Sequence, residues 1–150
     1  MIQRIQSIYL LLASIVLIIS IFFPIARMVA NGEEVAVLTN LYLTTGKTCS
    51  YNFVWLLIIV VGLCVILFYT IFIYKKRLTQ ILFCKVAIIT YFVYYIVFAI
   101  ASFMMMGKTD GSYALTLGAA CPLISLILTV LAKQAISKDE KMVRAADRIR

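Results

Sequence analysis

The amino-acid sequence predicts an all-α integral membrane protein. We expect a bundle of four transmembrane helices with a small β-hairpin in the first outer loop and a C-terminal cytoplasmic amphipathic helix. Of the 150 residues, 65% are hydrophobic and 13% are charged, and the mean hydropathy is +1.08. Soluble domains are about half apolar and a quarter charged. The length fits a single membrane domain over residues 1–150.

The four expected spans are apolar on all sides, as contact with lipid requires, and each approaches the roughly 20 residues that a bilayer needs. They cover about residues 7–23, 53–74, 84–106 and 113–132. Pro24 closes the first span because the residue before a proline disfavours the helical conformation. A cleaved signal peptide is the alternative for this span. However, its apolar run exceeds the usual length of about 7–15 residues, and only Arg4 precedes it as a base.

The basic residues are distributed unequally between the two sides of the membrane. Four spans place both termini and the middle loop on one side, leaving only Arg27, Lys47 and Lys108 of the 14 Lys and Arg residues on the other. The positive-inside rule therefore predicts that both termini are cytoplasmic. The net charge of +8 is explained by this topology signal. Nucleic-acid binding would need a basic face on a soluble module.

The outer loop, residues 26–52, contains Asn31-Gly32 between two β-prone runs. This dipeptide is the strongest short hairpin signal because both positions tolerate a positive φ. We expect strands near Arg27–Ala30 and Glu33–Leu38, and a third strand at Leu41–Leu43 stays open. The opposite loop, "GKTDGS", predicts only a turn.

The fourth span carries a stripe of small residues on one face. Its members, at steps of three or four, are Ala114, Gly118, Pro122, Ser125 and Thr129. Small residues let helices approach closely in a membrane, where no hydrophobic drive brings them together. Pro122 should kink the helix, because it removes the partner of the Gly118 carbonyl. We interpret this as a packing feature, with a ligand-admitting break as the alternative.

The third span carries polar groups near its middle, namely Tyr91, Tyr94 and Tyr95, and Ser102 continues the same face. A hydroxyl in hydrocarbon needs a partner, so this face should turn toward the bundle interior. Two interpretations remain: the hydroxyls tie the helices together, or the face lines a pocket for a lipid tail or a quinone.

The closing stretch "SKDEKMVRAADRIR" predicts a separate cytoplasmic helix over about residues 138–150. Ser137 and Glu140 form a capping-box pattern, acids lie in the first turn and bases in the last. The apolar positions fall on one face that should dock on a partner protein, on the inner loop or on the inner leaflet. The docking residues would be Met142, Val143, Ala146 and Ile149, with the bases Lys141, Arg144 and Arg148. A solvated cap on the fourth span is the remaining interpretation.

The sequence contains few of the residue types that catalysis uses. It has no His, the commonest metal ligand and general base, and its four cysteines form no CxxC motif. We therefore predict no catalytic, cofactor or metal site. Cys49 is the one cysteine expected outside, where a disulfide to another chain is conceivable.

The terminal stretches "MIQRIQSIYLLLA" and "SKDEKMVRAADRIR" resemble those of a family of small Bacteroidota membrane proteins, the domain of unknown function 4293. The resemblance covers the whole chain. It implies a bacterial inner membrane and a four-span body, and it implies no activity, substrate or active-site residue.

These observations favour a non-enzymatic accessory or scaffold subunit of a membrane protein complex. Its expected partners are the lipid bilayer and either another integral membrane protein or further copies of this chain. The alternative is a partner-dependent transporter or channel subunit, although the four apolar cores contain no ionisable residue at mid-depth, Lys85 being peripheral. A redox or lipid-processing enzyme is the third class, and the lack of paired outer cysteines and of His disfavours it.

Overall fold

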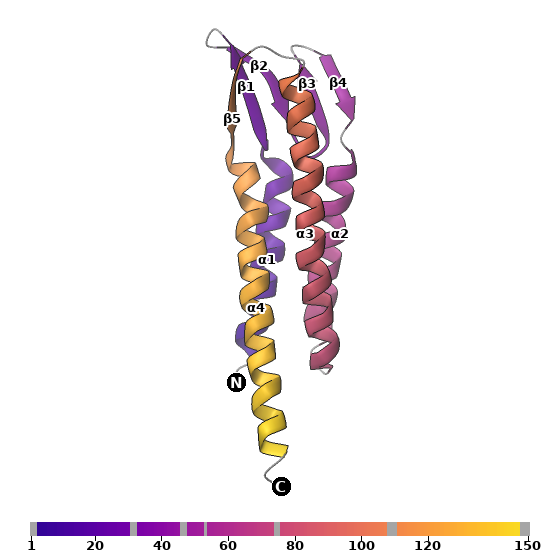
Figure 1. The fold of residues 1–150 in the computed structure, drawn as a ribbon, viewed down its shortest axis with the longest axis vertical. Coiled ribbons are helices and arrows are strands. Elements are labelled where there is room, and N and C mark those ends of the chain that lie inside the picture. The colour runs from indigo at the N-terminus through magenta and orange to yellow at the C-terminus, as the bar shows by residue number, and fades with distance from the viewer. Residues whose placement is uncertain are drawn as a thin grey trace.

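Within the residues that the computed structural model describes, namely 3–30, 33–45, 48–52, 54–73, 76–107 and 111–147, the chain forms four helices and one five-stranded sheet. The helices are α1 (Gln3–Phe22), α2 (Val54–Phe72), α3 (Arg77–Met106) and α4 (Leu117–Asp147). They run side by side along the long axis, and the sheet extends the bundle at one end (Figure 1). We call this the sheet end and the opposite one the far end.

The helices are apolar enough to suit a membrane. Three segments, Val54–Phe72, Arg77–Met106 and Leu117–Val143, have the length and composition to cross one, and the apolar part of α1, Gln6–Phe22, is shorter. Each helix buries one face and exposes large apolar side chains on the other, for example Ile58 and Ile89, which are 55% and 63% exposed. Such faces are suited to contact with lipid, since a soluble monomer rarely exposes apolar patches of this extent.

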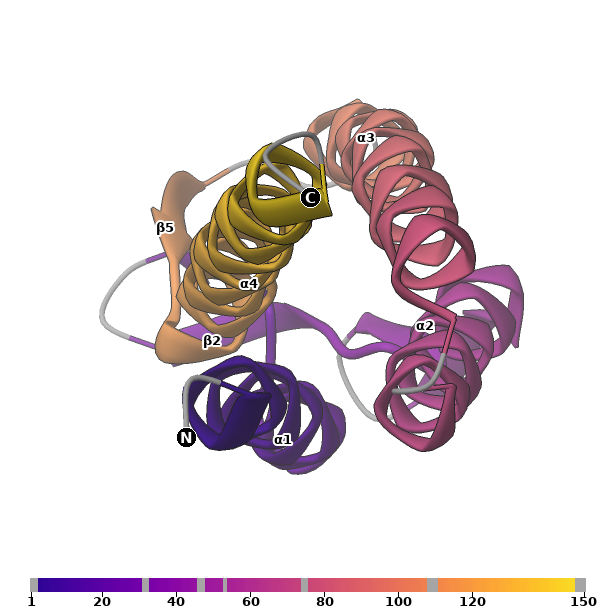
Figure 2. The same cartoon turned by 90° about the horizontal axis from the view of Figure 1, so that it is seen from below.

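The four helices form a ring in which each packs against two neighbours (Figure 2). α1 contacts α2 and α4, and α3 contacts the same two helices from the other side. The core contains Leu10 and Leu17 of α1 and Leu63 and Leu67 of α2, all fully buried. The helices stay close because small residues such as Ala13 lie between them.

The sheet is antiparallel throughout, with strand order β4-β3-β2-β1-β5. Its strands are β1 (Ala26–Ala30), β2 (Glu33–Leu38), β3 (Tyr42–Thr45), β4 (Thr48–Asn52) and β5 (Ser112–Leu115). The two predicted hairpin strands pair as expected, with Arg27 opposite Val37. The turn dipeptide Asn31-Gly32 lies outside the described residues. The predicted hairpin is only part of the sheet, because the described residues of the segment 26–52 form four strands.

Strand β5 begins at Ser112, the last residue of the loop that was expected to form only a turn, and replaces the first residues of the predicted fourth span. Ser112–Leu115 pairs with β1, so α4 begins at Leu117 and not near Tyr113. Both β1 and β5 adjoin the neighbouring helices α1 and α4 at the sheet end, so their backbones meet side by side. Pairing there satisfies backbone groups of β1 that would otherwise form a sheet edge.

The separate tail helix predicted at residues 138–150 is wrong. α4 is one helix of 31 residues from Leu117 to Asp147, and it extends past the other helices at the far end (Figure 1). The segment before Lys138 contains Lys133, Gln134 and Ala135, good helix formers, and neither Gly nor Pro. A capping pattern starts a helix only where the cap residue leaves the helical conformation, and Ser137 lies inside the helix.

Candidate functional site

The middle of the bundle holds a chain of hydrogen bonds that links three helices. Ser125 Oγ of α4 donates to the carbonyl of Ala13 on α1 at 2.7 Å. A serine has one hydroxyl proton, so Tyr91 of α3 must donate to Ser125 Oγ in their mutual hydrogen bond. Thr129 Oγ1 donates to the Ser125 carbonyl at 2.8 Å. Tyr91, Ser125 and Thr129 are fully buried, so these bonds satisfy groups that water cannot reach.

A second set of hydrogen bonds joins α1 and α3 to the loop between β2 and β3. Asn40 donates from Nδ2 to the carbonyl of Ser20 at 2.9 Å and accepts from the hydroxyl of Tyr94 at 3.1 Å. The Ser20 carbonyl lies in the last turn of α1, where carbonyls lack a partner within the helix. Asn40 therefore caps α1 and fixes it to α3 while only 1% exposed.

The other two residues of the predicted polar face also make bonds between elements. Tyr95 donates to the Ala119 carbonyl of α4 at 3.3 Å. Ser102 accepts from the hydroxyl of Tyr113, in β5, at 3.0 Å. The hydroxyls of this face thus tie elements together. Among the described residues, the buried side-chain polar atoms without a partner are Arg27 Nε and Thr116 Oγ1, and neither lies on the polar face.

The stripe of small residues predicted on the fourth span lacks its first member, Ala114, and begins at Gly118. Ala114 lies in β5, outside the helix, whereas Gly118, Pro122, Ser125 and Thr129 are buried along α4. At Gly118 the helix meets the turn after α1, since a Cβ there would lie 2.2 Å from the Pro24 carbonyl oxygen. Only glycine permits this approach. α4 continues through Pro122 as one helix.

At the far end, one polar pair joins α1 to α4. Gln6 donates from Nε2 to a carboxylate oxygen of Asp139, and the two residues are only 4% and 7% exposed. Asp139, which was predicted to lie in the first turn of a separate tail helix, is thus bonded to α1. Neither Asn40 nor this pair was identified from the sequence. The sequence feature that could have indicated them is a single amide side chain, Asn40 or Gln6, within or beside an apolar run.

The predicted docking residues lie on the last turns of α4 as far as the structure describes them. Met142 and Val143 are 45% and 42% exposed, and Lys141 is also exposed. Arg144 and Ala146 belong to the helix. Arg148 and Ile149 lie outside the described residues.

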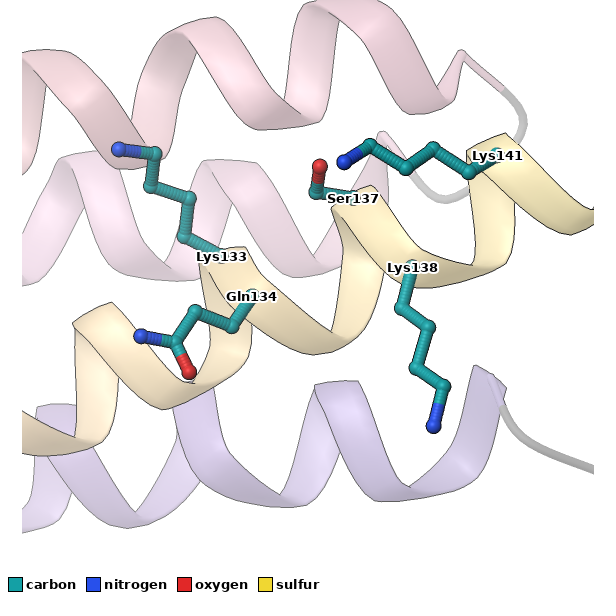
Figure 3. A pocket seen from close by; sticks show the side chains of 5 residues that line it. All are labelled: Lys133, Gln134, Ser137, Lys138 and Lys141. Carbon is teal, nitrogen blue, oxygen red and sulfur yellow. The ribbon is translucent and has the colours of Figure 1, made fainter.

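Beside these turns lies an open groove of about 310 Å³ on one side of α4. Its lining residues are Lys133, Gln134, Ser137, Lys138 and Lys141. In Figure 3, Ser137 and Lys141 point toward one another, Lys133 lies on the same side of the helix, and Lys138 extends the other way. Three ammonium groups, a hydroxyl and an amide suit an anion with several acceptor oxygens.

The described residues contain no group of three His, Cys, Asp or Glu side chains placed to hold a metal ion. Cys64 and Cys84 are buried free thiols and Cys121 is a partly exposed one. Cys49 lies in β4. The groove on α4 is the candidate site that we consider for ligand binding.

Comparisons with known proteins agree with the terminal stretches. The family model described as "Domain of unknown function (DUF4293)" matches residues 2–149, nearly the whole chain. No curated protein matches the sequence.

Proposed function

The chain belongs to the DUF4293 family, and we propose that it is a non-enzymatic integral membrane protein, an accessory or scaffold subunit of a complex in the bacterial inner membrane. In this proposal α1 crosses the bilayer with the other three helices, the sheet lies outside and both termini are cytoplasmic. The apolar outer faces of the helices and the bias of basic residues toward the far end support this placement.

One observation carries the scaffold role: the projection of α4 beyond the bundle with apolar side chains exposed. Val143 lies 26 residues after Leu117, which at 1.5 Å per residue is roughly 39 Å along the helix. The hydrocarbon of a bilayer is only about 30 Å thick. Lipid tails would therefore cover exposed residues such as Ile89 but would not reach Met142 and Val143. Contact with the surface of another protein would bury these two side chains.

The interior supports a structural role as well. The hydroxyls of Tyr91, Tyr94 and Tyr95 are all used in bonds between elements. Ion-coupled transport normally places an ionisable residue near mid-depth, and Asp139, a buried acid, lies at the far end against Gln6. A role as a partner-dependent transporter or channel subunit is the alternative.

The decisive experiment is purification of the tagged chain from native membranes in mild detergent, with co-purifying proteins identified by mass spectrometry. We expect a defined membrane protein that is lost when Met142 and Val143 are both changed to Ser. Ala145→Ser, also at an exposed position of the projection, is the matched control and should retain the partner. Recovery of the chain alone in every preparation would contradict the scaffold role. Ion flux in vesicles containing only this protein would favour transport.

A further inference from the structure

We propose that the groove on α4 binds the phosphate group of an anionic phospholipid from the cytoplasmic leaflet. The inference rests on the membrane placement proposed above and not on the partner, because the purified chain alone should bind the lipid. The occupant is defined by its chemistry: a phosphate diester with a net negative charge and two acyl chains.

The lining residues first establish a compact basic site. Lys133, Gln134, Ser137, Lys138 and Lys141 surround the groove, and at 100° per residue they fall within an arc of about 140° on one side of the helix. In the described part of the chain, none of the three lysines pairs with a carboxylate. Asp139 is bonded to Gln6 of α1. The groove therefore has the positive charges of Lys133 and Lys141 on the side of Ser137, and that of Lys138 on the other side of the helix (Figure 3).

The depth of the groove matches the phosphate layer. Lys133 and Lys141 lie 16 and 24 residues after Leu117, roughly 24 and 36 Å along the helix. These distances bracket the inner limit of a hydrocarbon layer about 30 Å thick. The site therefore lies where lipid phosphates are found, and lysine side chains reach such a plane readily because their stems pack on apolar surface.

The surface above the groove distinguishes a lipid from a soluble phosphate ester. Toward the sheet end, the same side of α4 carries Leu123, Ile127 and Leu131, which are 50%, 53% and 41% exposed. Leu123, Ile127, Gln134 and Lys141 recur at helical spacing, so an apolar strip leads into the basic groove. A ligand with a phosphate at one end and acyl chains at the other fits both parts. A free phosphate ester would use only the groove.

The test is a lipid titration of the purified full-length chain in detergent, with bound lipid counted by native mass spectrometry. Wild type should bind phosphatidylglycerol more tightly than phosphatidylcholine, whose ammonium group cancels the phosphate charge. Changing Lys133, Lys138 and Lys141 to Gln should weaken phosphatidylglycerol binding about 100-fold, from roughly five-fold per basic residue.

The matched control removes the same number of charges from the far end of a different helix. Lys76→Gln, Arg77→Gln and Lys85→Gln together should leave the affinity within about two-fold of wild type, since none of them lines the groove. An equal loss in both triple variants would show non-specific attraction and overturn the site. If the groove variant fails to fold, Lys138→Gln and Lys141→Gln, both exposed, are tested singly for a five-fold loss each. No loss in either would overturn the site.

A competition experiment separates the two sources of phosphate. Glycerol 3-phosphate carries the phosphate without acyl chains, and at concentrations equal to the lipid it should not displace phosphatidylglycerol. Displacement at equal concentrations would assign the groove to a soluble phosphate ester and overturn the lipid assignment. Failure of any of these measurements leaves the co-purification result unaffected, so this proposal and the scaffold proposal fail separately.

Discussion

The two ends of the bundle are held together by different means. At the sheet end, α4 lies against the turn after α1 at Gly118, Asn40 joins α1 to α3, and five strands connect the loops. At the far end, the pair Gln6–Asp139 joins α1 to α4, and α4 continues beyond it with the exposed Lys141. The sheet end is built for rigidity, whereas the far end leaves side chains available for binding.

This comparison predicts that the largest loss of stability comes from the tightest contact at the sheet end. Gly118→Ala should lower the free energy of unfolding by about 3 kcal/mol or more, because its Cβ would meet backbone atoms of Pro24 and Phe23 that cannot move alone. Thermal unfolding in mild detergent, followed by circular dichroism, measures the change. Gly62→Ala is the control, since nothing lies within 4 Å of its added Cβ. It should be neutral or stabilising by up to about 1 kcal/mol. Equal effects of the two substitutions would refute the close contact.

Removal of the cap on α1 should have the next largest effect. Asn40→Ala leaves both the Ser20 carbonyl and the buried Tyr94 hydroxyl without a partner. We expect a loss of about 2 kcal/mol, from the desolvation cost of unpaired buried groups. The same substitution in a Tyr94→Phe background should cost less, because one of those groups is then absent. A strictly additive double-mutant cycle would contradict the bond between Asn40 and Tyr94.

At the far end, loss of the polar pair should cost less than loss of the cap. Asp139→Leu leaves the Gln6 amide without its acceptor and should lower the unfolding free energy by about 1 kcal/mol, the scale of side-chain bonds between membrane helices. Asp139→Asn retains an acceptor oxygen and should cost less still. Hydrogen exchange should localise the effect of Asp139→Leu to the first turns of α1. Faster exchange at the sheet end instead would show that the two ends are not independent.

The smallest effect should come from the exposed ion pair between strands β1 and β2. The side chains of Arg27 and Glu34 are 39% and 50% exposed, and pairs at such surfaces contribute about 0.2–1 kcal/mol. Glu34→Gln should therefore shift the unfolding free energy by less than about 1 kcal/mol, and added salt should shrink the difference between variant and wild type. Glu33→Gln, one residue away, controls for the loss of charge alone. A loss exceeding that of Asn40→Ala would reverse the ranking.

Several features of the site could be predicted from residue type and spacing. Gly118, Ser125 and Thr129 recur at helical spacing, and a stripe of such small residues indicates a close contact between helices. Tyr91 and Tyr94 needed partners because a hydroxyl is costly in hydrocarbon. Their actual partners, Ser125 and Asn40, lie 34 and 54 residues away along the chain. The residues around each tyrosine in the sequence do not indicate partners that are so far away along the chain.

Predictions from short stretches of sequence were misleading where contacts with distant parts of the chain set the local structure. The tail from Ser137 has the capping residues and charge order of a helix start. The preceding helix does not end before it, however, because the buried side chains of Ile136 and Asp139 favour a continuous helix. The segment Ser112–Leu115 is short and weakly β-prone by itself. It becomes a strand because β1 offers it an unpaired edge.

By itself the sequence determined that the chain consists mainly of apolar helices, that residues 26–52 contain β-strands, and which segments carry most of the basic residues. Hydrophobicity, helix length and charge bias are properties of neighbouring residues, so they can be read along the chain. Only the tertiary structure decided that the loops form one five-stranded sheet, that Asn40 and Gln6 join helices, and that three lysines line a groove. Each of these depends on which segments meet in space, and packing sets that for the whole molecule.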